Sequence, residues 1–276
     1  MASPHVKALA DVLMFERAAA GAIIASAIAV VALRFGSLSA SGTAAAVGVG
    51  AASAAAGWNW GALLIIYFVV AVLLSRLGRV EKQRRTSGVL AKDGARDATQ
   101  VIANGGVFAA SVVLAQFGSG RFGVAMGIGA LGALAASSAD TWATEIGTLY
   151  GGTPRSLLTL RRVPSGTSGG VSTIGSLAMI AGAAFIAFVA KYIGLPDVVG
   201  IVTAAGVAGA AADSLLGATL QERRWCAPCN LASERRVHDC GAPTTLAGGR
   251  EWMDNDLVNL IATFAGAAVA ALLATL

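Results

Sequence analysis

Long apolar runs separated by short polar segments recur along almost the whole chain. About 20 apolar residues in a helix cross a hydrocarbon core of roughly 30 Å, so runs of this length predict membrane-spanning helices. We place eight of them at 17–35, 38–57, 59–77, 99–118, 122–147, 171–194, 196–220 and 256–276. The second run is rich in alanine and glycine and carries the weakest signal. The pattern predicts an all-α polytopic helix bundle that forms a single integral membrane domain over 1–276.

Composition supports this fold class. The chain is 56% apolar and 13% charged, with a mean hydropathy of +0.71, whereas about a quarter of the residues of a soluble domain are charged. A buried helix of a soluble protein could explain one such run, but not eight in succession. We expect no secretory signal peptide, because the first run starts near Arg17, follows both acidic and basic residues, and lacks a cleavage pattern.

The basic residues are distributed unequally between the breaks that separate the predicted helices. Sixteen of the 20 fall in the first, third, fifth and seventh breaks, which include three long loops at 76–98, 148–170 and 221–255. Because basic residues favour cytoplasmic loops, we expect these loops in the cytoplasm and both termini outside a cell (inner) membrane. The net charge of +5 therefore follows the topology rule and does not indicate nucleic-acid binding.

Small residues recur at four-residue spacing inside the predicted helices, as in Gly123–Gly127 and Gly206–Ala210. Such residues let helix backbones approach closely in lipid. The pattern favours a tightly packed monomer, with a homodimer as the second interpretation. The two halves of the chain show no convincing repeat, which argues against an inverted-repeat transporter.

Three carboxylates lie at membrane depth, near the ends of the predicted fifth and seventh helices. They are Asp140, Glu145 and Asp213. Carboxylates are costly in this position and indicate a functional site, and the predicted topology places all three towards the cytoplasmic face. The structural alternative is that they cap neighbouring helices or pair with loop arginines.

Two loops facing these acids carry candidate phosphate-binding groups. Lys92, Arg96 and Asn104 would share one face if the fourth helix begins early. The segment 164–172, rich in glycine, serine and threonine, opens the sixth helix and exposes backbone N–H groups that suit an anion. It lacks the ending of a Walker A motif. The candidate residues in this segment are Gly166, Thr167, Ser168, Gly169 and Gly170.

The last loop adds two further features. Asn255 and Asn259 form a polar face at the start of the eighth helix, preceded by Asp254, which could be its N-cap. Cys226, Cys229, His238 and Cys240 offer four ligands for a structural zinc ion. Because this loop is predicted to be cytoplasmic, free thiols or metal ligands are favoured over a disulfide.

Together these groups suit phosphoryl transfer next to a membrane. Mg²⁺ is usually held by one or two carboxylates and substrate phosphates, and phosphoryl transfer requires mainly positioning and charge neutralisation. Asp140, Glu145 and Asp213 would hold Mg²⁺ or orient the acceptor phosphate. The basic residues and the glycine-rich loop would bind phosphates, and the bilayer suits a lipid-soluble acceptor.

At these residues the chain resembles the integral membrane family that includes the plant phytyl phosphate kinase of tocopherol synthesis and the animal transmembrane protein 19. The matching stretches lie at 92–106, 139–147, 166–172, 213–221 and 254–259. They run through most of the chain from the third predicted helix onward. The cysteine and histidine cluster is similar to a feature of only part of that family.

The resemblance implies an isoprenyl phosphate kinase that uses Mg²⁺ and either CTP or ATP as donor, with CTP as the first choice. It places Asp97, in the first matching stretch, with the catalytic group. Two alternatives use similar parts. One is a cytidylyltransferase that makes a CDP-lipid, and the other is a cation- or proton-coupled transporter or flippase. A transporter would need acids near mid-depth, whereas the outer halves of these helices are almost purely apolar.

Overall fold

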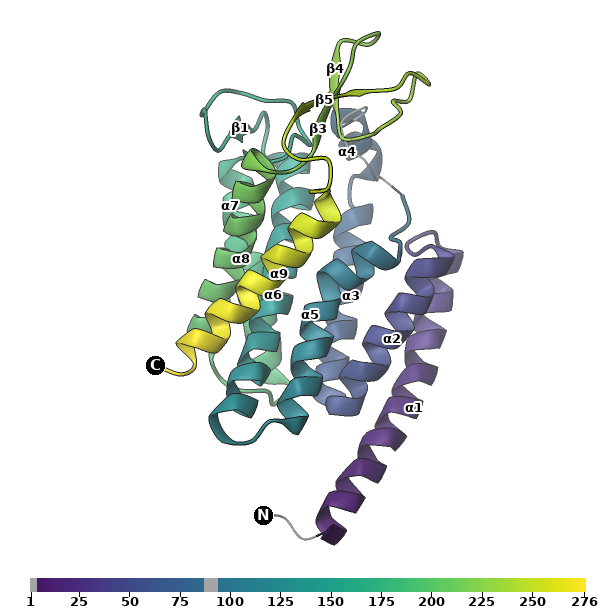
Figure 1. The fold of residues 1–276 in the computed structure, drawn as a ribbon, viewed down its shortest axis with the longest axis vertical. Helices are drawn as coiled ribbons and strands as arrows, with labels where there is room; N and C mark the ends of the chain where they lie inside the picture. Colours follow the sequence, from purple (N-terminus) through teal and green to yellow (C-terminus); the bar gives the residue numbers. More distant parts are fainter. Residues whose placement is uncertain (1–3, 87–93) are drawn as a thin grey trace.

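A computed structural model of the chain describes residues 4–86 and 94–276 and confirms the all-α bundle (Figure 1). Among the described residues, eight long helices correspond one to one with the eight predicted. They are α1 (Pro4–Arg34), α2 (Ala40–Ala56), α3 (Trp58–Arg76), α5 (Ala98–Phe117), α6 (Gly120–Tyr150), α7 (Thr173–Tyr192), α8 (Val199–Thr219) and α9 (Asn255–Leu273). Seven are long and apolar enough to cross a membrane, and α2, with 17 residues, is shorter.

The long connections gather at one end of the bundle, here called the loop end, and both termini lie at the other (Figure 1). The three loops at the loop end contain short elements that the sequence did not predict. These elements are α4 (Arg79–Thr86), β1 (Arg155–Ser156), β2 (Gly170–Val171), β3 (Arg223–Cys226), β4 (Leu231–Ser233) and β5 (Thr245–Gly248). The strands pair antiparallel, β1 with β2, and β3 between β4 and β5. The predicted grouping of the basic loops at one end is therefore reproduced in three dimensions.

Helix α6 is the centre of the bundle and packs against α3, α5, α7, α8 and α9. Leu131 and Leu134 are fully buried in it. Small residues make this packing possible, since a Cβ added at Gly132 would lie 2.4 Å from the carbonyl oxygen of Gly266 on α9. Gly206 on α8 is equally close to α6, because its added Cβ would lie 2.8 Å from Ala135. Close backbone approach thus holds the helices together, as the small-residue spacing predicted.

The first two helices form a pair at the edge of the bundle, and α2 joins this pair to α5 (Figure 1). A Cβ at Gly21 would lie 2.3 Å from Ala54, so these two helices also meet through small residues. The start of α2 is tied to the start of α5, because Ser39 N–H donates to the Arg96 carbonyl at 3.0 Å and Arg96 N–H donates to the Ser37 carbonyl at 3.1 Å. These contacts place Arg96 at the loop end of the bundle.

Candidate active site

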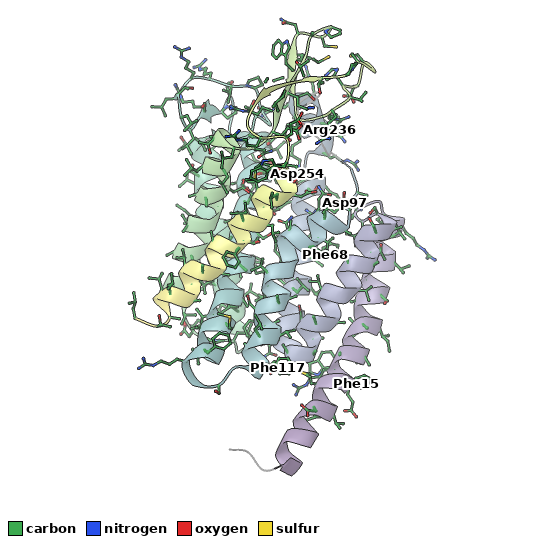
Figure 2. All side chains as sticks on the ribbon, viewed as in Figure 1. Phe15, Phe68, Asp97, Phe117, Arg236 and Asp254 are labelled. Carbon is green, nitrogen blue, oxygen red and sulfur yellow. The ribbon has the colours of Figure 1, made fainter. Side chains whose placement is uncertain are left out.

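A cavity of about 470 Å³ opens at the loop end, between α3, α4, α5, α6, α7, α8, α9 and the segment 164–172. Polar atoms gather at this end of the bundle, as the side chains of Figure 2 show. Nearly all the predicted site residues line this polar cavity: Arg96, Asn104, Asp140, Glu145, Gly166, Thr167, Ser168, Gly169, Gly170, Asp213, Asn255 and Asn259. Lys92 lies outside the described residues. Asp97 does not line the cavity.

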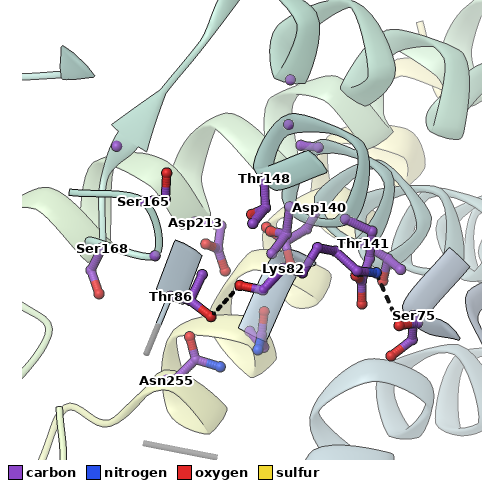
Figure 3. A pocket seen from close by; sticks show the side chains of 18 of the residues that line it. Ser75, Lys82, Thr86, Asp140, Thr141, Thr148, Ser165, Ser168, Asp213 and Asn255 are labelled. Carbon is purple, nitrogen blue, oxygen red and sulfur yellow. Dashed lines mark hydrogen bonds and ion pairs between the residues drawn. The ribbon is translucent and has the colours of Figure 1, made fainter. Parts of the chain in front are cut away.

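Asp140 on α6 and Asp213 on α8 point into the same part of the polar cavity (Figure 3). The Asp140 carboxylate repels that of Asp213, and Glu234 adds to the repulsion on Asp213. The Oδ2 atom of Asp213 is buried and accepts no hydrogen bond from any described residue. An uncompensated buried carboxylate oxygen is costly, so Asp213 together with the neighbouring Asp140 is suited to a cation.

Glu145 differs from these two acids because a lysine neutralises it. Its Oε2 atom lies 2.5 Å from Lys82 Nζ, and Lys82 is only 7% exposed. The ammonium also donates to the carbonyls of Leu74 (2.7 Å) and Ser75 (2.9 Å) at the end of α3, and its place in the cavity is drawn in Figure 3. The structural alternative considered from the sequence was pairing with a loop arginine, whereas the partner of Glu145 is a lysine. Nothing in the sequence distinguished Lys82 from the other basic residues of its loop.

Asn104 is held by hydrogen bonds that cross three helices. Tyr67 OH donates to Ser137 Oγ at 2.7 Å, Ser137 donates to Asn104 Oδ1 at 2.8 Å, and Asn104 Nδ2 donates to the Gln100 carbonyl at 2.9 Å. Both ends of the amide therefore have protein partners. Asn104 shapes the cavity wall and fixes α5 against α6.

Two arginines supply positive charge near the cavity wall. Arg76 donates to the carbonyl of Phe35 (2.9 Å) and to Ser37 Oγ (3.0 Å), and its guanidinium lies over the Phe35 ring, 5.4 Å from the centroid. Arg96 is half-buried in the cavity wall. Neither arginine forms an ion pair with a carboxylate among the described residues. Both charges are thus available to an anion.

The segment 164–172 lies against α8 and needs glycine to do so. Gly169 has φ +72°, and a Cβ there would lie 2.4 Å from Ala218. Thr167 Oγ1 is buried, lines the cavity, and makes no hydrogen bond within the described residues. Within the same part of the chain, the backbone N–H groups of Gly166, Ser168 and Gly169 donate to no protein acceptor. A cavity wall with unused donors is suited to phosphate oxygens.

The start of α9 completes the cavity wall. Asp254 caps the helix, because its Oδ1 atom accepts a hydrogen bond from Leu257 N–H at 2.9 Å. This is the N-cap role that the sequence suggested for Asp254. The side chains of Asn255 and Asn259 line the cavity and make no hydrogen bond to another described residue. Their amides can therefore contact a ligand.

Asp97 lies outside the cavity lining and caps α5, so its predicted place in the catalytic group stays a prediction. Its Oδ1 atom accepts from Gln100 N–H at 3.0 Å and from Thr99 Oγ1 at 2.9 Å, and Gln100 Oε1 accepts from Asp97 N–H at 3.1 Å. This reciprocal arrangement is a capping box. An acid just before an apolar helix accepts hydrogen bonds from that helix's first N–H groups. The sequence motif alone did not indicate this capping role.

A second, apolar cavity of about 120 Å³ lies beside the polar one, deeper between α1, α2, α3 and α5. Its wall includes the apolar side chains of Ile28, Leu64 and Phe68. Four residues line both cavities: Arg96, Gln100, Asn104 and Thr141. The sequence did not reveal this cavity, because its lining is dispersed over apolar helices.

The cysteine and histidine residues lie in the loop that carries β3, β4 and β5, and they are separate from the polar cavity. The candidate ligand atoms of Cys226, Cys229, His238 and Cys240 all lie within 4.8 Å of one another. A backbone hydrogen bond from Ala242, with a contribution from His238, lowers the pKa of the Cys240 thiol to about 6. The sequence missed Glu234 in the same loop, whose Oε1 atom accepts from Ser168 Oγ and from Gln221 Nε2, the latter at 3.0 Å.

Comparison with known proteins gives relatives over most of the chain. The family described as integral membrane protein DUF92 matches residues 23–267. Protein PGR of Arabidopsis thaliana is 30% identical over 225 residues, which cover 73% of this chain and 76% of that protein. The uncharacterized membrane protein MJ0933 of Methanocaldococcus jannaschii is 34% identical over 163 residues, or 58% of this chain and 65% of that one.

A second Arabidopsis thaliana relative is the chloroplastic protein VTE6. It is 29% identical over 217 residues, which cover 76% of this chain and 57% of VTE6. The chain therefore spans little more than half the length of this relative. No solved structure matches the chain.

Proposed function

The chain belongs to the integral membrane protein family DUF92, and from this starting point we propose that it is an isoprenyl phosphate kinase. In this proposal it transfers the γ-phosphate of CTP or ATP to a phytyl- or geranylgeranyl-type monophosphate and releases the isoprenyl diphosphate. The similarity to VTE6 and the family resemblance of the motifs support a reaction of this class.

The observation that carries the proposal is the shared wall of the two cavities. Arg96, Gln100, Asn104 and Thr141 separate a polar cavity that contains acids and unused donors from an apolar cavity between membrane helices. A ligand that occupied both would need an anionic head and a hydrocarbon tail. An isoprenyl monophosphate has this chemistry, with its phosphate next to Arg96 and its first carbons beside Phe68.

The size of the apolar cavity suits the start of an isoprenoid chain. An apolar cavity of roughly 150 Å³ takes up a benzene molecule, so about 120 Å³ accommodates one five-carbon isoprene unit. The rest of the tail would extend along α1 and α2 into the bilayer. The cavity therefore selects the end of the tail nearest the phosphate and leaves chain length unrestricted.

The acids of the polar cavity fit a bound Mg²⁺ ion. Asp213 Oδ2 has no partner among the described residues, and Asp140 repels it from α6. Two carboxylates that share a site with substrate phosphates are the usual ligands of Mg²⁺. We assign Asp140 and Asp213 to the metal, and Glu145 to positioning through Lys82. When bound, the ion would neutralise charge on the donor phosphates.

The chain's own groups would bind and orient the two phosphates. An oxygen of the acceptor monophosphate forms a bond to the γ-phosphorus of the donor, the bond from that phosphorus to the β,γ-bridging oxygen breaks, and the nucleoside diphosphate leaves. Because the acceptor phosphate is already anionic at neutral pH, no strong general base is required. Thr167, the N–H groups around Gly169, and the amides of Asn255 and Asn259 would hold the donor, while Arg96 would hold the acceptor.

The proposal also places the reaction on one side of the membrane. The charged residues of lowest exposure among the described residues all belong to the loop end: Lys82, Glu222, Arg224 and Asp256. Basic loops favour the cytoplasm, where nucleoside triphosphates are present. We therefore propose a cytoplasmic site in a cell (inner) membrane, with both termini outside. A proton- or cation-coupled transporter would need buried charge through the full depth of the bundle.

The test is an assay of the purified full-length chain in detergent or liposomes. Phytyl and geranylgeranyl monophosphates are each incubated with Mg²⁺ and either CTP or ATP, labelled once at the γ-phosphate and once at the α-phosphate. We expect label from the γ-phosphate in an isoprenyl diphosphate, with the α-label retained in the nucleoside diphosphate.

The two labels separate the kinase from the alternative enzyme. A CDP-lipid that carries the α-label, formed with release of pyrophosphate, would show that the enzyme is a cytidylyltransferase and not a kinase. If no prenyl monophosphate in the panel yields a product with either nucleotide, the proposal is wrong. Asp197→Asn is a suitable active control, because Asp197 lies between α7 and α8, is exposed, and pairs with Lys191 at 2.9 Å.

A further inference from the structure

We propose that Cys226, Cys229, His238 and Cys240 bind one zinc ion, which holds the loop between α8 and α9 in its folded form. This zinc site is separate from the polar cavity and does not depend on the proposed kinase activity. The proposal starts from geometry, because four ligand atoms from four positions of one loop lie within 4.8 Å of one another.

The distances fit a tetrahedral ion. With Zn–S bonds of about 2.3 Å and Zn–N bonds of about 2.0 Å, the ligands of a tetrahedral site lie about 3.5–3.8 Å apart. Cys226 Sγ lies 3.6 Å from Cys240 Sγ, and His238 Nδ1 lies 3.3 Å from Cys240 Sγ. A disulfide would need sulfur atoms about 2.05 Å apart, so this spacing suits metal ligands better than an oxidised pair.

The local fold brings the ligands together from the end of a β-hairpin and from a turn that follows it. Cys226 ends β3, Cys229 lies in the turn that leads to β4, and His238 and Cys240 lie in a turn that precedes β5. This turn is held by the hydrogen bonds of His238 N–H to the Ala242 carbonyl (3.0 Å) and of Gly241 N–H to the His238 carbonyl (2.8 Å). Cys226 is fully buried and His238 is only 7% exposed. Structural zinc ions are held by four protein ligands and no water, and three cysteines with one histidine are one of the usual ligand sets.

The loop needs such an ion because it has little apolar core of its own. Its other buried contacts are mainly ionic, such as the ion pair of Arg224 and Glu222 at 3.1 Å. Its strands contain only three or four residues each. Small units without a sufficient hydrophobic core are commonly stabilised by a metal.

The zinc site would also position a residue at the polar cavity. Glu234 directly follows β4, between the ligands Cys229 and His238 in the sequence. Its carboxylate accepts hydrogen bonds from Ser168 on the glycine-rich segment and from Gln221. Zinc would thus fix the loop that carries Glu234 against the segment 164–172. Loss of zinc should release this contact while the helices stay folded.

The first measurement is the zinc content of the full-length chain, purified in detergent without a polyhistidine tag and analysed by inductively coupled plasma mass spectrometry. We expect about one zinc per chain. His238→Ala and Cys229→Ser should reduce this value to near zero. The matched control is His5→Ala, which changes the only other histidine of the chain and should leave the zinc content unchanged.

A second measurement uses the unaltered chain, because a cysteine variant could fail to fold. A strong zinc chelator is added while released zinc and thiol reactivity are followed together. The three cysteines of the chain should be protected before chelation and reactive afterwards, with one zinc released per three thiols. Hydrogen exchange should then rise in the loop 221–254 and stay unchanged in α6.

Three results would overturn the proposal. The first is a chain that contains three reactive thiols and takes up no zinc when zinc is supplied. The second is a disulfide between Cys226 and Cys240 in metal-free protein, seen by mass spectrometry without reduction. The third is zinc that leaves without any change in the exchange of the loop, which would remove the structural role. All of these results are independent of any kinase assay.

Discussion

The two halves of α6 meet their surroundings in opposite ways. From Gly120 to Ala136 the helix is packed by apolar residues, and small residues bring it close to α8 and α9. From Ser137 to Tyr150 the same helix carries Asp140 and Glu145 into a cavity. The first half is surrounded by other protein atoms on all sides that face the bundle, whereas the second half presents acidic side chains to an open cavity.

This difference indicates where a substitution should act. In the first half the free energy comes from close packing, so a change should alter stability and leave the activity of the folded molecules unchanged. In the second half, groups without partners destabilise the free protein and become satisfied only when a ligand binds. A change there should alter activity with little loss of stability.

The largest effect is expected for Asp140→Asn and Asp213→Asn. Each substitution removes half of the proposed Mg²⁺ ligand set, so the rate of diphosphate formation should fall about 100-fold or more. Thermal unfolding should occur at the same or a higher temperature, because the repulsion between the two carboxylates is relieved. Initial rates at saturating Mg²⁺ and a melting curve in detergent measure both quantities.

The control for these variants is Asp197→Asn at the opposite end of the bundle, which should retain full activity. If Asp140→Asn or Asp213→Asn also kept full activity, the corresponding carboxylate would have no role in holding the metal. A fall in activity with an equal loss of folded protein would make that aspartate structural instead.

A second prediction concerns the ion pair of Lys82 and Glu145. Lys82→Met leaves the Glu145 carboxylate half-buried without its partner and also leaves the last carbonyls of α3 without a donor. Breaking a buried pair on one side should cost about 3 kcal/mol of stability. The double variant with Glu145→Gln should recover part of this loss in chemical unfolding, and equal stability of the single and double variants would refute the coupling.

A third prediction tests the packed half of α6. Gly132→Ala places a Cβ 2.4 Å from the Gly266 carbonyl oxygen, so α6 and α9 must separate, at a cost of about 2 kcal/mol. The same change at Gly48 meets nothing within 4 Å and should be neutral or stabilising. The activity per folded molecule should be the same in both variants. A lower specific activity in Gly132→Ala would show that the two halves of α6 are not independent.

The smallest effect is expected for Thr167→Val, which removes a buried hydroxyl that lacks a partner among the described residues. The free protein should gain stability slightly, because an unsatisfied polar atom is lost. The KM for the nucleotide should rise roughly tenfold, as for a lost hydrogen bond to a charged ligand. An unchanged KM would place the donor phosphates elsewhere in the cavity.

The bundle could be predicted from the sequence because hydrophobic runs and loop charges act along the chain. All eight helices, the grouping of the basic loops and the close packing at Gly206 followed from these signals. Most of the candidate site was also accessible, since Asp140 and Asp213 are out of place in lipid whatever the tertiary fold. The capping role of Asp97 was not predicted, because a helix cap and a site acid look the same in a motif.

The parts that were missed depend on contacts between distant segments. Lys82 and Glu145 are 63 residues apart, and Ser168 and Glu234 are 66 apart, so only the fold brings each pair together. The short strands β3, β4 and β5 have too few residues to show a period. The apolar cavity is formed by gaps between helices whose residues individually look like ordinary membrane-facing positions.

The central claim is that the polar and apolar cavities form one site for an amphiphilic phosphate. The most direct test is photolabelling with an isoprenyl monophosphate that carries a diazirine in its first isoprene unit, followed by peptide mass spectrometry. We predict labels on Ile28, Leu64 or Phe68. An excess of isoprenyl monophosphate without the diazirine should prevent this labelling, whereas the isoprenyl alcohol should not. The account would be contradicted if labels spread over exposed membrane-facing residues such as Phe188 of α7, or if the competing monophosphate did not reduce the labelling.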